Sequence, residues 1–284
     1  MSAVIKLSSP PTGEFWEIPV LFEDDQLLAL DKPPKLLVSP DRYDAERPNL
    51  MKLLHAAIEK AAPWTRTRNL SYLMNAHRLD FETSGIILLA KSKPVLVALA
   101  DLFGNNRPAK TYIALVHGQP ATSTFEVNAS LAPHPTRPGY IRVDEKNGKS
   151  SQTAFKVLEQ FRGCALVECH PVTGRTHQIR VHLRHAGLPI MGDALYGGSQ
   201  LLLSRLKPDY RLKYGKFEKP LIDRVALHAA ELKIPHPTTG VEVAITAPWP
   251  KDLTVAVKYL RRYAAVAGAA VPVADANLGT PDQP

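Results

Sequence analysis

Apolar residues in this chain come in short runs that are separated by Gly, Pro and acidic turn signals. Runs of this kind are typical of β-strands. The strand patterns fall at residues 19–22, 27–30, 36–38, 86–89, 112–116, 153–158, 165–169, 225–234 and 241–246. They outnumber the helical patterns and do not alternate with them regularly. The sequence therefore predicts an α+β fold with a mixed, mostly antiparallel central sheet and flanking helices.

Three segments show a helical period instead. Apolar residues recur at spacings of three and four from Leu50 to Ala61, with Asn49 as the expected cap. A second helix is expected to start at Ser92 and to stop near Gly104. Thr176 is expected to cap a third helix over residues 177–186, with Gly187 just beyond its end. Residues 63–76 are expected to form a loop, and residues 131–148 a loop or an irregular hairpin.

The length of 284 residues allows one large domain or two modest ones. We expect residues 1–17 to form a short leader, residues 18–263 to form one domain, and residues 264–284 to form a disordered tail. No apolar run approaches the roughly 20 residues that span a membrane. The first 15 residues contain no apolar segment typical of a signal peptide, which predicts a cytoplasmic protein without a membrane partner.

The two cysteines, Cys164 and Cys169, lie five residues apart in a strand pattern, which places them on opposite faces. They are expected to be buried structural thiols. Because there are only two of them, a disulfide scaffold and a four-cysteine zinc site are excluded.

The segment His77–Asp80 reads HRLD and comes just ahead of the strand pattern at 86–89. This order places a carboxylate, Asp80, and an arginine, Arg78, at the entrance to a buried strand. An ordinary surface ion pair beside a turn is the alternative. The following Thr83–Gly85 lacks the spacing of a phosphate-binding loop.

The segment Gly174–Arg180 reads GRTHQIR. Arg175 and Thr176 would lie at the positive N-terminal end of the expected helix, where anions bind well. His177, Arg180 and Arg184 would share one helix face. The alternative is a solvated basic face. A metal site is not expected, because interleaved arginines repel a cation and no zinc spacing occurs among His170, His177, His182 and His185.

The net charge is +8, and most of it comes from the segment between Arg175 and Lys219, which contains nine basic and three acidic residues. Tyr210, Tyr214 and Phe217 interleave with the basic residues. This combination suits RNA, because cations neutralise phosphates and aromatic rings stack on bases. A solvated lysine-rich insert is the alternative.

Together these segments resemble the RluA family of RNA pseudouridine synthases. The resemblance extends over about residues 18–250 and is most specific in the HRLD and GRTHQIR motifs. The other matching segments are Val20–Asp25, Leu30–Pro33, Lys110–Tyr112, Gly192–Gly197 and Leu227–Ala229. The resemblance implies the pseudouridine synthase fold with a catalytic cleft, and an isomerase that converts uridine to pseudouridine in RNA without a cofactor or a metal.

The resemblance also implies roles for individual residues. Asp80 is the essential carboxylate, Arg180 pairs with it and fixes its rotamer, and Tyr112 packs on the target base. Tyr112 is also a candidate for removing the C5 proton, although a phenol that ionises near pH ~10 is a weak base. Arg78 fills the space of the base that is flipped out of a stem. The further expected RNA contacts are His77, Lys110, Arg175, Thr176, His177 and Arg184.

The chain departs from the family pattern where Lys35 replaces the usual glycine after Lys-Pro, which puts the local turn in doubt. Because few residues precede the match, we expect the separate N-terminal RNA-binding domain of many relatives to be absent. The expected partner is a stem-loop of ribosomal RNA or tRNA, bound by a monomer. Two alternatives are a non-catalytic RNA-binding protein on the same fold and a metal- or phosphate-dependent hydrolase.

Overall fold

A computed structural model describes residues 4–41, 44, 46–212 and 215–266 of the chain. The described residues form two compact units. The first unit runs to Thr111 and includes Ala229–Ala247, and the second comprises Tyr112–His228 and the chain from Pro248 onward. Strands β6 (Ala109–His117) and β12 (Leu227–Pro235) each begin in one unit and end in the other.

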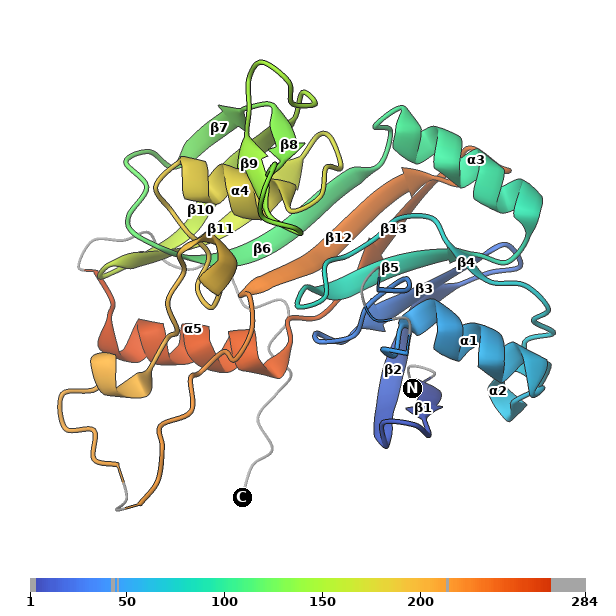
Figure 1. Cartoon of the computed structure of the whole chain (residues 1–284), viewed down its shortest axis with the longest axis horizontal. Helices are drawn as coiled ribbons and strands as arrows, with labels where there is room; N and C mark the ends of the chain where they lie inside the picture. The colour runs from blue at the N-terminus through green and yellow to red at the C-terminus, as the bar shows by residue number, and fades with distance from the viewer. Residues whose placement is uncertain (1–3, 42–43, 45, 213–214, 267–284) are drawn as a thin grey trace. The chain divides into compact units, whose positions relative to one another are not determined.

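The first unit is a sheet with three helices (Figure 1). Its strands follow the order β1-β2-β3-β5-β12, with β4 added to β5 and β13 added to β12. The remaining elements of this unit are β1 (Val4–Ser9), β2 (Glu14–Glu23), β3 (Leu27–Lys32), β4 (Met74–Asn75), β5 (Ser84–Ala90), β13 (Glu242–Thr246), α1 (Leu50–Glu59), α2 (Pro63–Arg66) and α3 (Lys93–Gly104).

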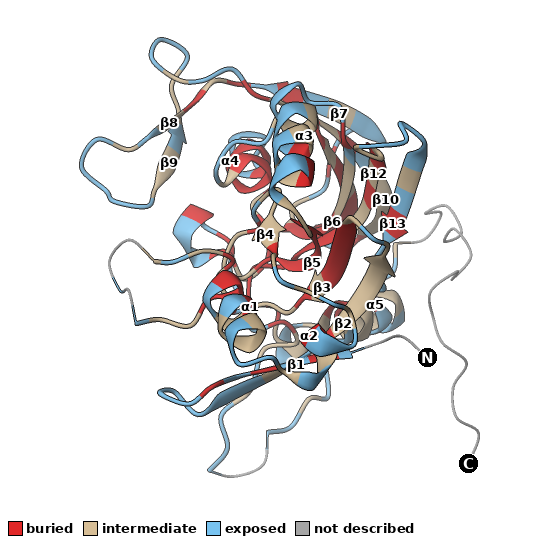
Figure 2. Ribbon diagram, turned by 90° about the vertical axis from the view of Figure 1, so that its right-hand side faces the viewer, coloured by how far each residue is buried: buried red, intermediate tan, exposed pale blue. Residues whose placement is uncertain are grey.

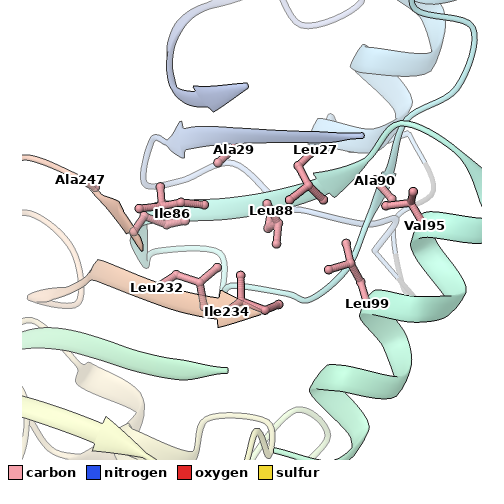
Figure 3. Packing of buried hydrophobic residues seen from close by; sticks show 11 residues of the cluster. Leu27, Ala29, Ile86, Leu88, Ala90, Val95, Leu99, Leu232, Ile234 and Ala247 are labelled. Carbon is pink, nitrogen blue, oxygen red and sulfur yellow. The ribbon is translucent and has the colours of Figure 1, made fainter. Parts of the chain in front are cut away.

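The core of this unit lies between the sheet and α3. Figure 3 shows Leu88 of β5 and Leu232 and Ile234 of β12 pointing toward the same apolar cluster as Leu99 of α3. All seven residues of β5 are buried, as its red colour in Figure 2 indicates. Strand β5 is therefore a rigid base for the chain segment that precedes it.

The expected leader is instead part of the sheet. Residues 4–9 and 14–23 form the antiparallel hairpin β1–β2, which buries Ile5, Leu7 and Ile18. The alternation of exposed and buried residues along β1 and the positive φ of Gly13 in the turn are typical of a β-hairpin. The expectation of a leader over residues 1–17 was therefore wrong for its described part.

Gly85, the second residue of β5, is required by the close approach of β12. Its φ is +107°, and a Cβ built there would lie 2.2 Å from the carbonyl oxygen of Ala229. We expect Gly85→Ala to lower the free energy of unfolding by about 3 kcal/mol, since backbone strain and overpacking add. Urea denaturation measures this loss. Gly104→Ala, where a Cβ meets nothing within 4 Å, is the control, and an equal effect of both changes would contradict the explanation.

The second unit contains the antiparallel order β6-β11-β10-β7 and the separate hairpin β8–β9. Helix α4 packs on β10, β11 and β9. The elements of this unit are β7 (Thr124–Asn128), β8 (Leu131–Pro133), β9 (Ile141–Val143), β10 (Gln152–Phe161), β11 (Cys164–Pro171), α4 (Gln178–His185), the short 3₁₀ turns η1 (Ala194–Tyr196) and η2 (Leu203–Arg205), and α5 (Lys251–Tyr263). The predicted α+β class with a mostly antiparallel sheet is confirmed.

The described chain continues past the expected domain end at residue 263. Ala264 is buried, and its carbonyl accepts a hydrogen bond from the Arg162 amide. The expected tail over residues 264–284 thus begins with packed residues, and its part from 267 onward lies outside the described residues.

An ion pair fastens α5 within this unit. The Arg224 guanidinium binds both carboxylate oxygens of Asp252 in α5, at 2.7 and 3.0 Å.

The local helix signals were largely correct. Asn49 caps α1, since its Oδ1 accepts a hydrogen bond from the Lys52 amide at 2.9 Å. Ser92 caps α3, and Gly187 follows α4 with a φ of +75°. The loop expected at 63–76 contains α2 and β4 as well.

Within the described ranges, no helix has the length and the apolar character needed to cross a bilayer.

Candidate active site

Asp80 lies in a turn of the first unit that is fastened to β5. The Ala76 amide donates to the Leu88 carbonyl at 2.9 Å, which continues the pairing of β4 with β5. The Thr83 amide then donates to the Asp80 carbonyl at 3.2 Å, and β5 begins one residue later. Asp80 is half-buried, whereas Arg78 is exposed. The turn therefore holds the carboxylate close to the protein surface with an arginine beside it.

Two lysines, Lys32 at the end of β3 and Lys35 just after it, hold this turn from the other side. The Lys32 ammonium is fully buried and donates to the carbonyls of Pro33 at 2.7 Å, Leu36 at 2.9 Å and Phe81 at 3.5 Å. The Lys35 amide donates to the same Phe81 carbonyl at 2.8 Å. These bonds fix the residue directly after Asp80.

Lys35 forms this turn although it replaces a glycine of the family pattern. Its φ is +61°, in the left-handed region that glycine adopts without strain. The departure noted in the sequence therefore leaves the local turn intact.

His77 is held as a structural residue of the same segment. Its Nε2 accepts the Leu88 amide hydrogen at 3.0 Å, and its ring stacks on Phe103 of α3 at 5.0 Å. Burial, with a smaller contribution from the Lys110 charge, lowers the pKa of His77 to about 4. His77 is thus neutral near pH 7, and its ring is turned inward to the fold.

Lys110 lies near His77 at the start of β6, where burial lowers the pKa of its ammonium to about 8. Its positive charge is therefore fully present only well below pH 8. A lysine of this kind can bind a phosphate or a polar group of a nucleotide in neutral solution.

In the second unit, α4 begins one residue later than expected. His177 occupies its N-cap position with a left-handed φ of +54°, and no side chain caps the helix. The expectation that Thr176 caps this helix was wrong. His177 is held by its ring, since its Nδ1 lies 2.8 Å from the Tyr196 hydroxyl, which also accepts the Ile141 amide hydrogen at 3.0 Å.

Arg180 is buried and bound by a carboxylate of its own unit. Its Nε and Nη2 donate to the two oxygens of Asp193 at 2.6 and 2.8 Å, and its guanidinium lies 4.9 Å from the centre of the Tyr196 ring. A bidentate pair of this kind fixes the plane of the guanidinium. Arg184, four residues further along α4, is exposed, and His177 occupies the N-cap position, so that only Arg180 of these three expected residues is buried.

A buried polar network fastens α4 to the sheet. The Gln178 amide group donates to the Gln152 carbonyl at 2.9 Å and to the Thr153 hydroxyl at 3.0 Å. His182 lies one turn further on, with its Nδ1 at 2.9 Å from Thr153 and its Nε2 at 3.0 Å from the Ser151 hydroxyl. Burial lowers the pKa of His182, so a neutral ring joins the network. The helix that carries Arg180 is thus rigidly placed.

The other candidates of the second unit lie closer to solvent. Arg175 and Thr176 are exposed just before α4. Tyr112 is half-buried on β6, where it pairs with Cys169 of β11. Of the three residues expected to be catalytic, Asp80 thus belongs to the first unit, and Tyr112 and Arg180 belong to the second.

The cysteines are buried, as expected from their strand. Burial raises the pKa of the Cys164 thiol to about 12 and raises that of Cys169 as well, so neither is a nucleophile near neutral pH. In the part of the chain that the structure describes, no three His, Cys, Asp or Glu side chains are grouped so that they could hold a metal ion.

Sequence reasoning missed the roles of Asp193, Tyr196 and Lys32. The segment Gly192–Gly197 was noted only as part of the family resemblance, with no role for its residues, although Asp193 is the first acidic residue after α4 and a buried arginine needs a carboxylate partner. No comparable local signal identifies Lys32, because its acceptors are backbone carbonyls.

The class of this protein follows from comparison with known families. Residues 26–185 match the family model described as RNA pseudouridylate synthase. The chain belongs to this family of isomerases, which convert uridine to pseudouridine in RNA, and the resemblance found in the sequence is confirmed.

Individual relatives agree with this assignment. The chain is 36% identical over 245 residues to the ribosomal large subunit pseudouridine synthase C of Vibrio vulnificus (strain CMCP6), covering 85% of this chain and 69% of the relative. It is 35% identical over 250 residues to the enzyme of the same name from Escherichia coli (strain K12), covering 85% and 70%. The structure titled human RNA Pseudouridylate Synthase Domain Containing 4 matches with a TM-score of 0.64 at 24% identity, covers 89% of this chain and 94% of that one, and thereby shows the fold.

Proposed function

We propose that this chain isomerises one or more uridines of large-subunit ribosomal RNA. The relatives named ribosomal large subunit pseudouridine synthase C, which are 35% and 36% identical over most of the chain, support this RNA over tRNA. The protein is proposed to act as a monomer in the cytoplasm. The observation that carries the catalytic part is the Asp80 turn, which is held on one side by β5 and on the other by Lys32 and Lys35.

In the proposed reaction the glycosidic bond between N1 and the ribose C1′ breaks, the uracil rotates, and a C5–C1′ bond forms. The proton of C5 is lost and N1 gains one, so that nothing is consumed overall. The Asp80 carboxylate acts against the nucleotide by one of three routes: attack on C1′, attack on the uracil ring, or removal of the ribose 2′ proton. Each route requires an ionised carboxylate in a fixed place, and the bonds to the Phe81 carbonyl support that requirement.

Arg180 and Tyr112 complete the proposed site. The role of Arg180 rests on the family resemblance, and its bidentate bond to Asp193 fixes the plane of the guanidinium. Tyr112 packs on the target base. Lys110, Arg175, Thr176 and Arg184 contact the RNA, whereas His77 and His177 act by shaping their segments.

Arg78 is proposed to occupy the space of the flipped uridine, because it is exposed and lies two residues before Asp80. Extrusion of a base from a stem costs a few kcal/mol, part of which an inserted side chain recovers. We expect Arg78→Ala to lower kcat/KM about tenfold more on a stem-loop than on an unstructured oligonucleotide. Arg107→Ala, at an exposed arginine of the same unit, is the control. Equal losses on both substrates would remove the flipping role.

The proposed function is tested with an unmodified large-subunit rRNA transcript and the purified protein. Pseudouridine should form at defined positions, and a chelator should leave the rate unchanged. Release of free uracil or phosphate would indicate a hydrolase, and binding without pseudouridine would indicate a non-catalytic RNA-binding protein.

A further inference from the structure

The second unit carries a long loop between η1 and β12. The amide of Leu221 donates to the carbonyl of Leu201 at 2.8 Å, which closes the loop at its base, and the adjoining Leu201 and Ile222 are buried. Between them, η2 is the only element among the described residues 202–212 and 215–220, which Figure 1 draws in yellow and orange. Loops of this length in compact proteins are uncommon and often functional. We call residues 202–220 the basic loop.

The basic loop carries half of the net charge of the chain. It contains six lysines or arginines and two acidic residues. Arg205, Arg211, Lys216 and Lys219 are exposed. Of the two acidic residues, Glu218 is engaged at the base of the loop, where its carboxylate accepts the Ser204 amide hydrogen at 2.8 Å. Hydrogen bonds from Ser204 lower the pKa of Glu218, which therefore stays ionised as an acceptor.

Phe217 stands out among the apolar residues of this loop. Its exposed fraction is 96%, compared with 45% for Leu212. Tyr210 is half-buried, and Tyr214 lies outside the described residues. Burial of phenylalanine side chains stabilises folded proteins, and an exposed ring such as that of Phe217 adds almost nothing of this kind to its unit. Glu218, the next residue, accepts the hydrogen bond from the Ser204 amide. The Phe217 ring is exposed to solvent and lies between Lys216 and Lys219 in the sequence.

We propose that the basic loop binds a single-stranded stretch of the RNA substrate, with the Phe217 ring stacked on one unpaired base and the flanking lysines on phosphates. An exposed ring between cations matches a nucleotide, which presents a flat apolar base beside an anionic phosphate. Stacking of this kind tolerates any base, because every base has an aromatic face. The inference rests on the proposed function only in that it takes RNA to be the partner.

The test uses an oligocytidine 12-mer, which contains no uridine and so isolates the loop from the isomerisation. Phe217→Ala should weaken its binding about tenfold, which is within the range of one lost base–aromatic stack, and Phe217→Trp should retain it. The new tryptophan should also lose fluorescence when the oligonucleotide binds. The control is Phe15→Ala, which removes a ring that is 57% exposed on β2 of the other unit and should leave binding unchanged.

A second variant tests the charge separately from the ring. Each phosphate contact with a single strand contributes a slope of about −0.7 to the dependence of log affinity on log salt. The double change Lys216→Gln and Lys219→Gln should therefore make the slope less steep by about 1.4. An unchanged slope would remove the two lysines from the binding surface.

The inference is overturned if Phe217→Ala binds oligocytidine as tightly as the unchanged protein. It is also overturned if Phe217→Ala weakens binding to anionic phospholipid vesicles or to polyglutamate but not to oligocytidine, because the loop would then serve a membrane or a protein. These results are independent of the isomerase assay. If the protein makes pseudouridine and Phe217→Ala still binds oligocytidine tightly, only the inference is refuted. If Phe217→Ala loses binding but the unchanged protein makes no pseudouridine, only the proposed function is refuted.

Discussion

Replacement of Asp80 with asparagine is expected to abolish pseudouridine formation, with a loss of about 10⁴-fold or more, at the upper end of what one positioned acid–base group supplies. Asparagine has the same shape but carries no charge, so none of the three proposed routes remains open to it. The fold should persist, because the turn is held by the backbone carbonyls of Asp80 and Phe81 and by the buried Lys32.

The control for this change is Glu82→Gln, which removes a second half-buried carboxylate from the same turn. Its activity should stay near that of the unchanged protein. Thermal denaturation and RNA binding should be alike for both variants. Substantial turnover by the Asp80 variant would refute the assignment of the essential carboxylate.

Replacement of Asp193 with asparagine is expected to impair both stability and catalysis. Removal of one partner from a buried ion pair costs about 3–5 kcal/mol, because the other charge is left in a poorly solvated place. Asp193 is 1% exposed and binds Arg180 through both oxygens. A guanidinium that shifts by about 1 Å should lower kcat about 100-fold, while KM changes little.

The pair of Arg224 and Asp252 provides a matched control, because it has the same bidentate geometry in the same unit. Asp252→Asn should destabilise the protein by a smaller amount, since the Asp252 side chain is 31% exposed. Its kcat, measured on the folded protein, should not change. Equal losses of kcat in the two variants would show that Asp193 acts only through general stability.

The local elements were predictable because their signals are local. Asn49 and the spacing of apolar residues define α1 without reference to the rest of the chain. The start of α4 was misplaced because His177 takes its left-handed conformation together with a contact to Tyr196, which lies 19 residues further on. A preference for Thr176 as a cap could not reveal that contact.

Long-range pairing explains the other differences. The sequence did not show that Arg180 is buried, because its carboxylate partner, Asp193, lies 13 residues further along the chain. Residues 4–9 alternate between exposed and buried side chains, but the expectation of a leader over residues 1–17 did not include their pairing with residues 14–19. The motifs predicted candidate site residues, and the structure shows how Phe81, Asp193 and Tyr196 hold the segments that carry them.

The most direct test is to map pseudouridines in a large-subunit rRNA transcript, free of modification, after incubation with the purified protein. We predict new pseudouridines at one or a few defined uridines, in amounts that rise with time, and none with the Asp80→Asn variant. A transcript that the protein binds but that gains no pseudouridine would contradict the proposed substrate. Pseudouridine formed equally by both proteins would contradict the proposed catalytic site.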